Sequence, residues 1–163
     1  MCFVAGTKVK TFDGDKNIED IEAGDYVFSK NTETGETGYK LVEEVFQNET
    51  PEIIRLEIAG EVIETTANHP FWVSGYGFKN AGFLKTGDVI ETIDGNLYPV
   101  LSAERFYPTE DVKVYNFRVA DWHTYYVSEI GILVHNDKCG PDVARRSESG
   151  SDFTKYSPIN PCD

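Results

Sequence analysis

The sequence predicts an all-β fold, and three observations lead to this prediction. Short segments that alternate apolar and polar residues recur along the chain, and dipeptides typical of tight turns separate them. Helical periodicity is almost absent, so only isolated helical turns are expected. Stretches of the first half are echoed in the second half, which indicates an internal duplication. A chain of 163 residues is long enough to bury one hydrophobic core.

The expected strands are short and are bounded by turn residues. Asp13-Gly14 and Asp94-Gly95 favour tight turns between antiparallel strands, and Ala59-Gly60 separates two further strand-like segments. One helical turn is expected over each of 17–22 and 80–84. In chain order, the segments expected to form strands are 7–12, 26–29, 40–46, 53–58, 61–66, 71–73, 89–93, 98–106, 112–120 and 125–128.

The internal echo has two parts. Residues 18–27 resemble residues 81–90, and both segments contain a Gly-Asp step. The strand expected at 53–58 likewise has an apolar counterpart at 115–119. Two halves of similar design predict duplicated β-units related by a pseudo-two-fold axis.

Composition excludes several classes of partner. Asp and Glu number 28 against 15 Lys and Arg, which gives a net charge of −13, and the longest basic cluster is only Arg145-Arg146. Phosphate backbones require clustered basic residues, so we expect no nucleic-acid partner and interpret the acidity as a solvated surface. No apolar run approaches the roughly 18 residues of a membrane span, so no membrane partner is expected.

The expected domain covers residues 1–136. Residues 137–163 are rich in Gly, Pro, Ser and charge, so we expect an extended or poorly ordered flanking segment there. The start of the chain lacks the basic and apolar regions of a signal peptide, and Met1 is expected to be the remainder of an N-terminal flank. We expect a monomeric piece of a larger precursor, whose cellular location the sequence leaves open.

Cys2 is the first candidate for chemistry, because a thiolate can attack the carbonyl carbon of the preceding residue, Met1. The attack converts the amide into a thioester, which requires help from neighbouring groups. His69 can give a proton to the departing nitrogen, while Thr66 and Asn68 can hydrogen-bond around the scissile bond.

Asn136 is the second candidate, because its side-chain amide can close a ring onto its own carbonyl. That reaction leaves a succinimide and releases the chain from Asp137 onward. His135 can polarise the carbonyl or move the proton, and His123 is a candidate second acid or base. Every one of these residues suits cutting a peptide bond of the chain itself.

Other interpretations of the same residues stay open. The three histidines have no regular ligand spacing, so we expect neither a metal site nor a cofactor. Cys139 and Cys162 match no zinc motif, and the sequence does not determine whether they pair. A non-catalytic acidic β-domain for binding or spacing also fits the composition, but it treats the cysteine, histidines and asparagine as coincidence.

Four blocks, in order and at suitable spacing, resemble the Hint superfamily of inteins and Hedgehog autoprocessing domains. The resemblance covers Cys2 to Asn136. The blocks are 2–7 with 21–25, then 66–70, then 114–119 with 123–125, and finally 131–136.

The resemblance implies a horseshoe-like fold in which both ends of the domain converge on one site. Cys2 is then the N-terminal nucleophile, and Thr66 and His69 assist its acyl shift. His123 couples the steps, and His135 assists the cyclisation of Asn136. Small thiols or amines, besides water, are then expected to accept the acyl group, and the polypeptide partners are the chain's own flanks.

Two departures from inteins shape the expected outcome. Inteins carry Cys, Ser or Thr after the terminal Asn, whereas this chain has Asp137, so cleavage of both flanks is expected to dominate over inefficient splicing. Asn116 stands where many inteins have Asp. The chain is most similar to bacterial intein-like domains, whose downstream flank is non-nucleophilic. A Hedgehog-like transfer to a sterol is the alternative, but that chemistry has no use for a terminal Asn.

Overall fold

The structure is a computed structural model, and it describes residues 1–136. Nearly all of this part of the chain lies in antiparallel strands, joined by tight turns and two short 3-10 helices. No helix in residues 1–136 is long and apolar enough to cross a membrane. The elements are β1 (Phe3–Val4), β2 (Lys8–Thr11), β3 (Gly14–Asn17), η1 (Ile18–Asp20), β4 (Tyr26–Lys30), β5 (Thr37–Thr50), β6 (Ile53–Ile58), β7 (Glu61–Thr65), β8 (Pro70–Val73), β9 (Gly77–Asn80), η2 (Ala81–Phe83), β10 (Val89–Glu91), β11 (Leu97–Phe106), β12 (Val112–Val119), β13 (Thr124–Val127) and β14 (Ile132–His135).

The all-β prediction is confirmed, and every expected strand has a counterpart in the structure. The two expected helical turns are present as η1 and η2. Four strands were not expected: β1, β3, β9 and β14, which are two to four residues long. β5 is also longer than expected, at 14 residues, because it pairs with β4 along its first part and with β12 along the rest.

The order of strands around the sheet matches each strand of one half with an equivalent strand of the other, which locates the predicted pseudo-two-fold axis. One run of neighbours is β10-β11-β6-β7-β1-β12-β5-β4, so β10 matches β4, β11 matches β5, β6 matches β12 and β7 matches β1. The order continues through β2-β13-β14-β8, and β8 also pairs with β10, which closes the ring. Equivalent strands therefore meet at two places, where β7 lies beside β1 and where β13 lies beside β14.

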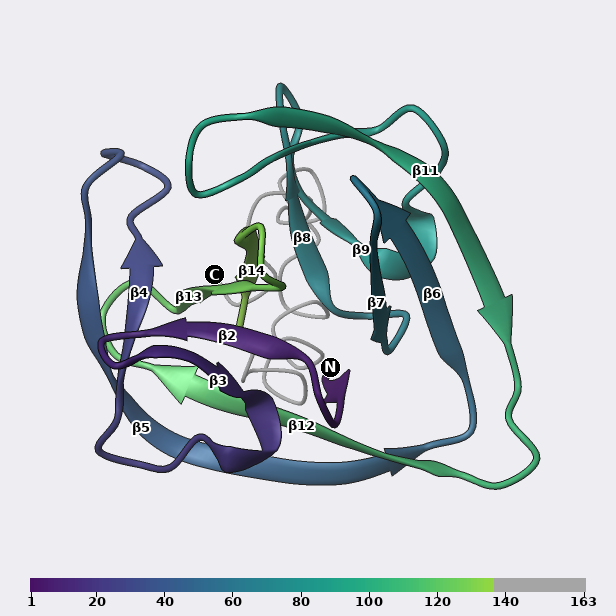
Figure 1. The fold of residues 1–163 in the computed structure, drawn as a ribbon, viewed down its shortest axis with the longest axis horizontal. Helices are drawn as coiled ribbons and strands as arrows, with labels where there is room; N and C mark the ends of the chain where they lie inside the picture. Colours follow the sequence, from purple (N-terminus) through teal and green to yellow (C-terminus); the bar gives the residue numbers. More distant parts are fainter. Residues whose placement is uncertain (137–163) are drawn as a thin grey trace, which may run out of the picture.

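The two halves are interlocked through their long strands. β5 is followed in the chain by β6, yet it pairs with β12, and β11 is followed by β12, yet it pairs with β6. Figure 1 shows the two exchanged pairs along different sides of the ring, with β13 and β14 towards the middle. Neither half can form its sheet without the other, because each long strand depends on a partner from the opposite half.

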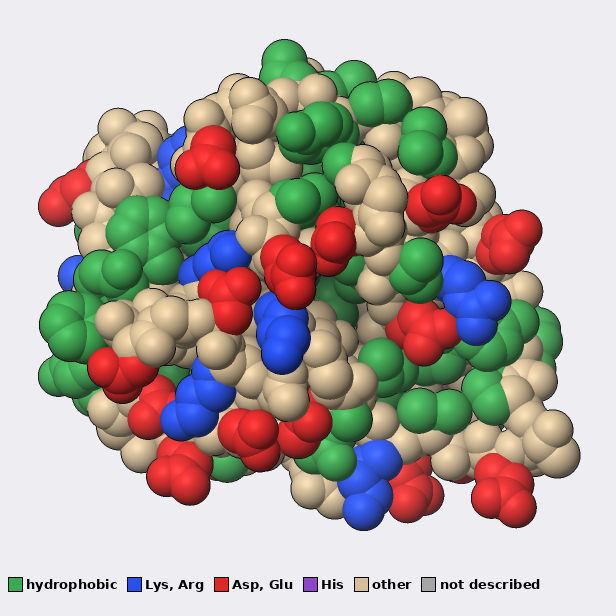
Figure 2. Space-filling view, viewed as in Figure 1, with side chains coloured by type: hydrophobic (Ala, Val, Ile, Leu, Met, Phe, Trp, Pro, Cys, Tyr) green, Lys and Arg blue, Asp and Glu red, His purple; other side chains and the backbone are tan. Residues whose placement is uncertain are grey.

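The core lies inside the ring and is built from side chains of both halves. Phe3, Phe71, Phe117 and Tyr125 are among its largest fully buried members. The outer surface carries acidic side chains interspersed with lysine and arginine, as Figure 2 shows for one face. Burial of apolar side chains such as these stabilises the fold, by about 25 cal/mol for each Å² of apolar surface removed from water.

Candidate active site

The N-terminal end of the site is formed where β1 meets β7. Cys2 directly precedes β1 and is 2% exposed, and Thr66 directly follows β7. Because Phe3 is in register with Thr65, the antiparallel pairing brings the backbones of Cys2 and Thr66 together. The Cys2 amide nitrogen donates to Thr66 Oγ1 at 2.9 Å, and the Thr66 amide nitrogen donates to the Cys2 carbonyl at 3.0 Å.

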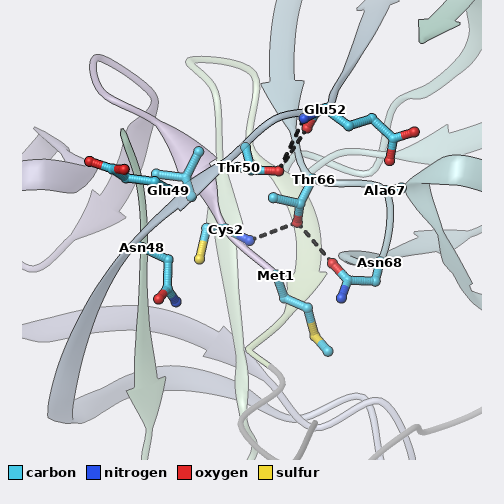
Figure 3. Close-up of a pocket in the computed structure, with 10 residues that line it drawn as sticks. Met1, Cys2, Asn48, Glu49, Thr50, Glu52, Thr66, Ala67 and Asn68 are labelled. Carbon is cyan, nitrogen blue, oxygen red and sulfur yellow. Dashed lines mark hydrogen bonds between the residues drawn. The ribbon is translucent and has the colours of Figure 1, made fainter. Parts of the chain in front are cut away.

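The hydroxyl of Thr66 is oriented by a further contact. Thr66 Oγ1 donates to Asn68 Oδ1 at 3.0 Å, which leaves its lone pairs for the Cys2 N–H. Figure 3 shows this chain of hydrogen bonds from Cys2 through Thr66 to Asn68, with the Cys2 sulfur on the opposite side. The amide nitrogen that would leave in the reaction is thus held by an aligned acceptor.

A cleft of about 430 Å³ opens at this end of the site. Both residues of the Met1–Cys2 bond line it, together with Thr66 and Asn68 (Figure 3). The end of β5 and the following turn supply the opposite wall, through Asn48, Glu49, Thr50 and Glu52. Its size suits a small molecule or an extended peptide segment.

His69 is the most enclosed of the candidate groups. Its ring is fully buried and packs 4.3 Å from the Phe3 ring, with the Tyr125 ring at 6.3 Å, measured between centroids. Its own carbonyl accepts from the Ala81 amide at 2.9 Å, which fixes the backbone just before β8. No other histidine in residues 1–136 is buried so completely.

The surroundings of His69 keep its ring neutral. Burial holds the pKa of His69 well below its usual value of 6.5, and the charges of the Met1 α-amino group and of His135 lower it further. Backbone groups of Met1 and His135 face the ring and act in the opposite direction. Neither ring nitrogen makes a well-aligned hydrogen bond within residues 1–136, so both are available for a reacting group. His69 therefore lies between the two ends of the domain.

The C-terminal end of the site is built on β13 and β14. Thr124 is in register with His135, and the Asn136 amide nitrogen donates to the His123 carbonyl at 2.9 Å. Asn136 is 1% exposed, and both polar atoms of its side chain lack a hydrogen-bond partner within residues 1–136. Within residues 1–136, therefore, no hydrogen bond holds this side-chain amide in place.

His135 and His123 differ sharply in their surroundings. His135 is 2% exposed, and burial, followed by the nearby charge of His123, lowers its pKa to about 3. The centroid of the Phe78 ring lies 5.1 Å from that of the His135 ring. The His123 ring lies 6.2 Å from the His135 ring, also between centroids, and is exposed to solvent. His123 is thus open to solvent, whereas His135 stays neutral at physiological pH.

One glycine positions the strand that carries His135 and Asn136. Gly131 has a φ of 75°, and a Cβ atom there would lie 2.5 Å from Ile93 Cγ2. The Gly131 carbonyl also accepts from the Ile93 amide at 2.8 Å, so the two backbones are held close together. Only glycine fits both the conformation and the space.

Two neighbours of the site, Thr65 and Tyr125, were not among the predicted site residues. Thr65 Oγ1 donates to the Cys2 carbonyl at 2.9 Å, so Cys2 is bonded from two successive threonines. The Tyr125 hydroxyl donates to Asn116 Oδ1 at 2.8 Å, and this side chain also accepts from the Phe117 amide. The threonine before Thr66 and the first tyrosine after His123 were visible in the sequence, but their partners depend on strand register.

The predicted site residues gather in two groups on the pseudo-two-fold axis. Cys2, Thr66 and Asn68 lie where β7 meets β1. His123, His135 and Asn136 lie where β13 meets β14, and His69 lies between the groups. Asp137, Cys139, Cys162 and the expected flank 137–163 fall outside the described residues.

Comparison with known proteins identifies the family. Residues 8–137 match the pretoxin HINT domain family. The chain belongs to this family. As a Hint domain, it is a self-processing domain of the splicing type in general, and it acts within its own flanking segments. A search of curated proteins gave no significant match.

Solved structures agree with this assignment. A bacterial intein-like domain from Clostridium thermocellum is 46% identical with a TM-score of 0.80, and the match covers 83% of this Hint domain chain and 98% of that chain. The gp41-1 intein is 28% identical with a TM-score of 0.69, over 83% and 98% of the two chains. A DnaB intein from Synechocystis sp. PCC 6803, at 18% identity and a TM-score of 0.70 over 85% and 100%, shares the fold. The predicted Hint fold is thereby confirmed.

Proposed function

We propose that residues 1–136 act as one domain that cuts its own chain at two bonds, Met1–Cys2 and Asn136–Asp137. The observation that supports this most directly is the position of His69, which is faced by backbone groups of both Met1 and His135. One neutral imidazole, whose nitrogens make no well-aligned hydrogen bond within residues 1–136, can serve a reaction at either bond. Cys2, Thr66, Asn68, His69, His123, His135 and Asn136 are the proposed catalytic residues.

The proposed N-terminal step is an N–S acyl shift. The Cys2 sulfur attacks the Met1 carbonyl carbon, a C–S bond forms, and the C–N bond to Cys2 breaks. His69, which is neutral, accepts the proton of the Cys2 thiol as the sulfur attacks and gives a proton to the departing Cys2 nitrogen, which becomes an amine. The bond from this nitrogen to Thr66 Oγ1, at 2.9 Å, holds it while its amide resonance is lost. Water, a small thiol or an amine entering through the cleft then opens the thioester and restores the Cys2 thiol.

The proposed C-terminal step is the cyclisation of Asn136. Its Nδ2 attacks its own carbonyl carbon, a five-membered succinimide forms, and the C–N bond to Asp137 breaks. The Asp137 nitrogen leaves as an amine after taking a proton. His135, neutral because its pKa is lowered to about 3, can accept the proton of the attacking nitrogen, and exposed His123 can exchange it with solvent.

Independent cleavage of the two flanks follows from the residue after Asn136. Asp137 offers no hydroxyl or thiol to accept the acyl group from Cys2, so a transfer that would join the flanks lacks its usual acceptor. We therefore propose release of each flank as the main outcome, with ligation a minor one. No metal or cofactor takes part in either step.

The proposal is tested by intact-mass spectrometry on the domain with flanks restored at both ends, incubated with and without a thiol. Cys2→Ala should abolish thiol-induced release of the upstream flank, and Asn136→Ala should abolish release of the downstream flank. Cys139→Ala and Asn96→Ala, which change the same residue types elsewhere, should cleave like the parent. If Cys2→Ala and Asn136→Ala also cleave like the parent, the proposal is wrong.

A further inference from the structure

The turn that presents His123 is strained. In residues 1–136 only four residues other than glycine have a positive φ, and two of them, Asp121 at 65° and His123 at 55°, flank Trp122. Left-handed conformations are unfavourable for residues with a Cβ atom and persist only when surrounding contacts impose them. The Trp122 amide donates to the Ala120 carbonyl at 2.7 Å, which makes the turn tight.

One side chain from the opposite half of the molecule holds this turn. Lys40, in the first part of β5, places its ammonium nitrogen 3.0 Å from Asp121 Oδ2. The same nitrogen lies 4.3 Å from the centre of the Trp122 ring, a cation–π distance. The Leu41 carbonyl accepts from the Ala120 amide at 2.9 Å, so the neighbouring backbone of β5 holds the start of the turn as well.

The turn connects directly to the C-terminal end of the site. The His123 carbonyl accepts the Asn136 amide at 2.9 Å, and the His123 ring lies beside the His135 ring. On the far side of the turn, Thr124 is fixed to β4 by its hydroxyl, which donates to the Lys30 carbonyl at 2.8 Å. The conformation between these anchors sets where the Asn136 backbone lies.

We infer that Lys40 is a positioning residue for cleavage after Asn136. By holding Asp121 and Trp122, it keeps the His123 carbonyl under the Asn136 amide and the His123 ring beside His135. The N-terminal group makes its contacts through β7 and Thr66, none of which involves this turn. Lys40 should therefore affect only one of the two cleavages. The inference rests on the proposed function, because it concerns the rate of one proposed step.

The test compares release of the two flanks from the same molecule. Lys40→Met keeps the length of the side chain but removes the ion pair and the cation–π contact, and we expect downstream release to slow by about threefold to tenfold. Thiol-induced upstream release should stay within about twofold. Lys40→Arg retains both contacts and should restore the parent rate. Lys85→Met, which removes a lysine paired with Asp88, is the matched control and should change neither rate.

A second measurement does not depend on cleavage. In a Cys2→Ala, Asn136→Ala background, where no flank is released, Lys40→Met should accelerate hydrogen exchange of the residue-136 amide by a similar factor. Exchange of the Thr66 amide, which donates to the Cys2 carbonyl, should be unchanged.

Each outcome bears on the inference separately from the proposed function. A parent that releases both flanks while Lys40→Met slows neither, or slows both equally, overturns the inference and leaves the proposed function intact. Unchanged exchange at residue 136 also overturns it. A parent that releases no flank overturns the proposed function, and with it the role of Lys40 in cleavage.

Discussion

The two halves of the molecule share one frame but not one chemistry. In the first half Lys16 bonds Asp25 at 2.9 Å, and in the second Lys79 bonds Asp88 at 3.0 Å. Each aspartate also accepts a backbone amide three residues earlier, at 2.9 and 3.0 Å. The glycines before the two aspartates have φ values of 100° and 99°. The duplication therefore extends from the strand order to individual hydrogen bonds.

The halves differ where the chemistry is proposed. The Ile18 amide donates to the Thr7 carbonyl at 2.8 Å, and the equivalent Ala81 amide donates to the His69 carbonyl at 2.9 Å. Thr7 thus holds the place of His69 in the first half, and its hydroxyl donates to the Val4 carbonyl at 2.7 Å. In the first half the Thr7 side chain bonds within its own loop. In the second half the buried His69 imidazole is faced by backbone groups of Met1 and His135. The comparison indicates that the duplicated frame sets the fold and that His69, a residue of the proposed site, departs from it.

The largest expected effect on the cleavage rate comes from substituting His69, the residue that distinguishes the second half from the first. His69→Gln should slow thiol-induced release of the upstream flank by about 10²- to 10⁴-fold, the usual contribution of a general acid–base group. Thr7→Val, at the equivalent position, should leave the rate within about twofold. If both variants slowed upstream release equally, His69 would act only by supporting the fold, as Thr7 does.

The pH dependence of stability near neutral pH should come from two buried histidines of the second half, His69 and His135. The pKa values of His69 and His135 are lowered in the folded state, to about 3 for His135, from a usual value of 6.5. Between these values the unfolded chain binds protons that the folded chain does not, so this stability is complete above pH 6.5 and is lost as pH falls. Each histidine should contribute roughly 1 kcal/mol per pH unit.

Denaturant unfolding between pH 7 and pH 5.5 measures this slope. His135→Gln should reduce it by about half, because only His69 then remains buried and neutral. Thr7→Val should leave the slope unchanged, since the first half buries no histidine at the equivalent place. A slope that His135→Gln does not alter would contradict the assignment.

The smallest expected effect is a difference in stability between variants of the Lys16–Asp25 and Lys79–Asp88 ion pairs. Lys79 and Asp88 have side-chain exposures of 14% and 12%, against 37% and 27% for Lys16 and Asp25. Solvent screens the first-half pair more, so Asp25→Asn should cost about 0.5 kcal/mol of unfolding free energy and Asp88→Asn about 1 to 2 kcal/mol. Thermal or denaturant unfolding of the two variants checks the order. The reverse order would mean that exposure does not determine the strength of these pairs.

Much of this fold could be predicted from the sequence, because the longer strands alternate and the turns carry their typical dipeptides. β3 and β9 could not, since Gly14–Asn17 and Gly77–Asn80 alternate poorly and pair mainly through their backbones with β2 and β8. The length of β5 was also hidden. Val42 is its only fully buried residue within residues 37–50, so its neighbours rather than its own pattern hold it extended.

The candidate site likewise has residues that the sequence identifies and contacts that it does not. Cys2, His69 and Asn136 were identifiable because their side chains suit the chemistry and fall in motifs that resemble a known family. The bond from Thr65 to the Cys2 carbonyl depends on the register of β1 against β7, which joins residues far apart in the chain. Lys40 lies farther still from Asp121, and no local pattern connects them.

The exchange of long strands has a consequence for timing during synthesis. β14 is the last strand of the ring to leave the ribosome, and it carries the residues that complete the pocket around His69. The nascent polypeptide therefore cannot complete the surroundings of His69 until β14 has emerged. We expect the domain to stay inert until β14 has emerged, so that a segment ahead of it is fully synthesised before it is set free.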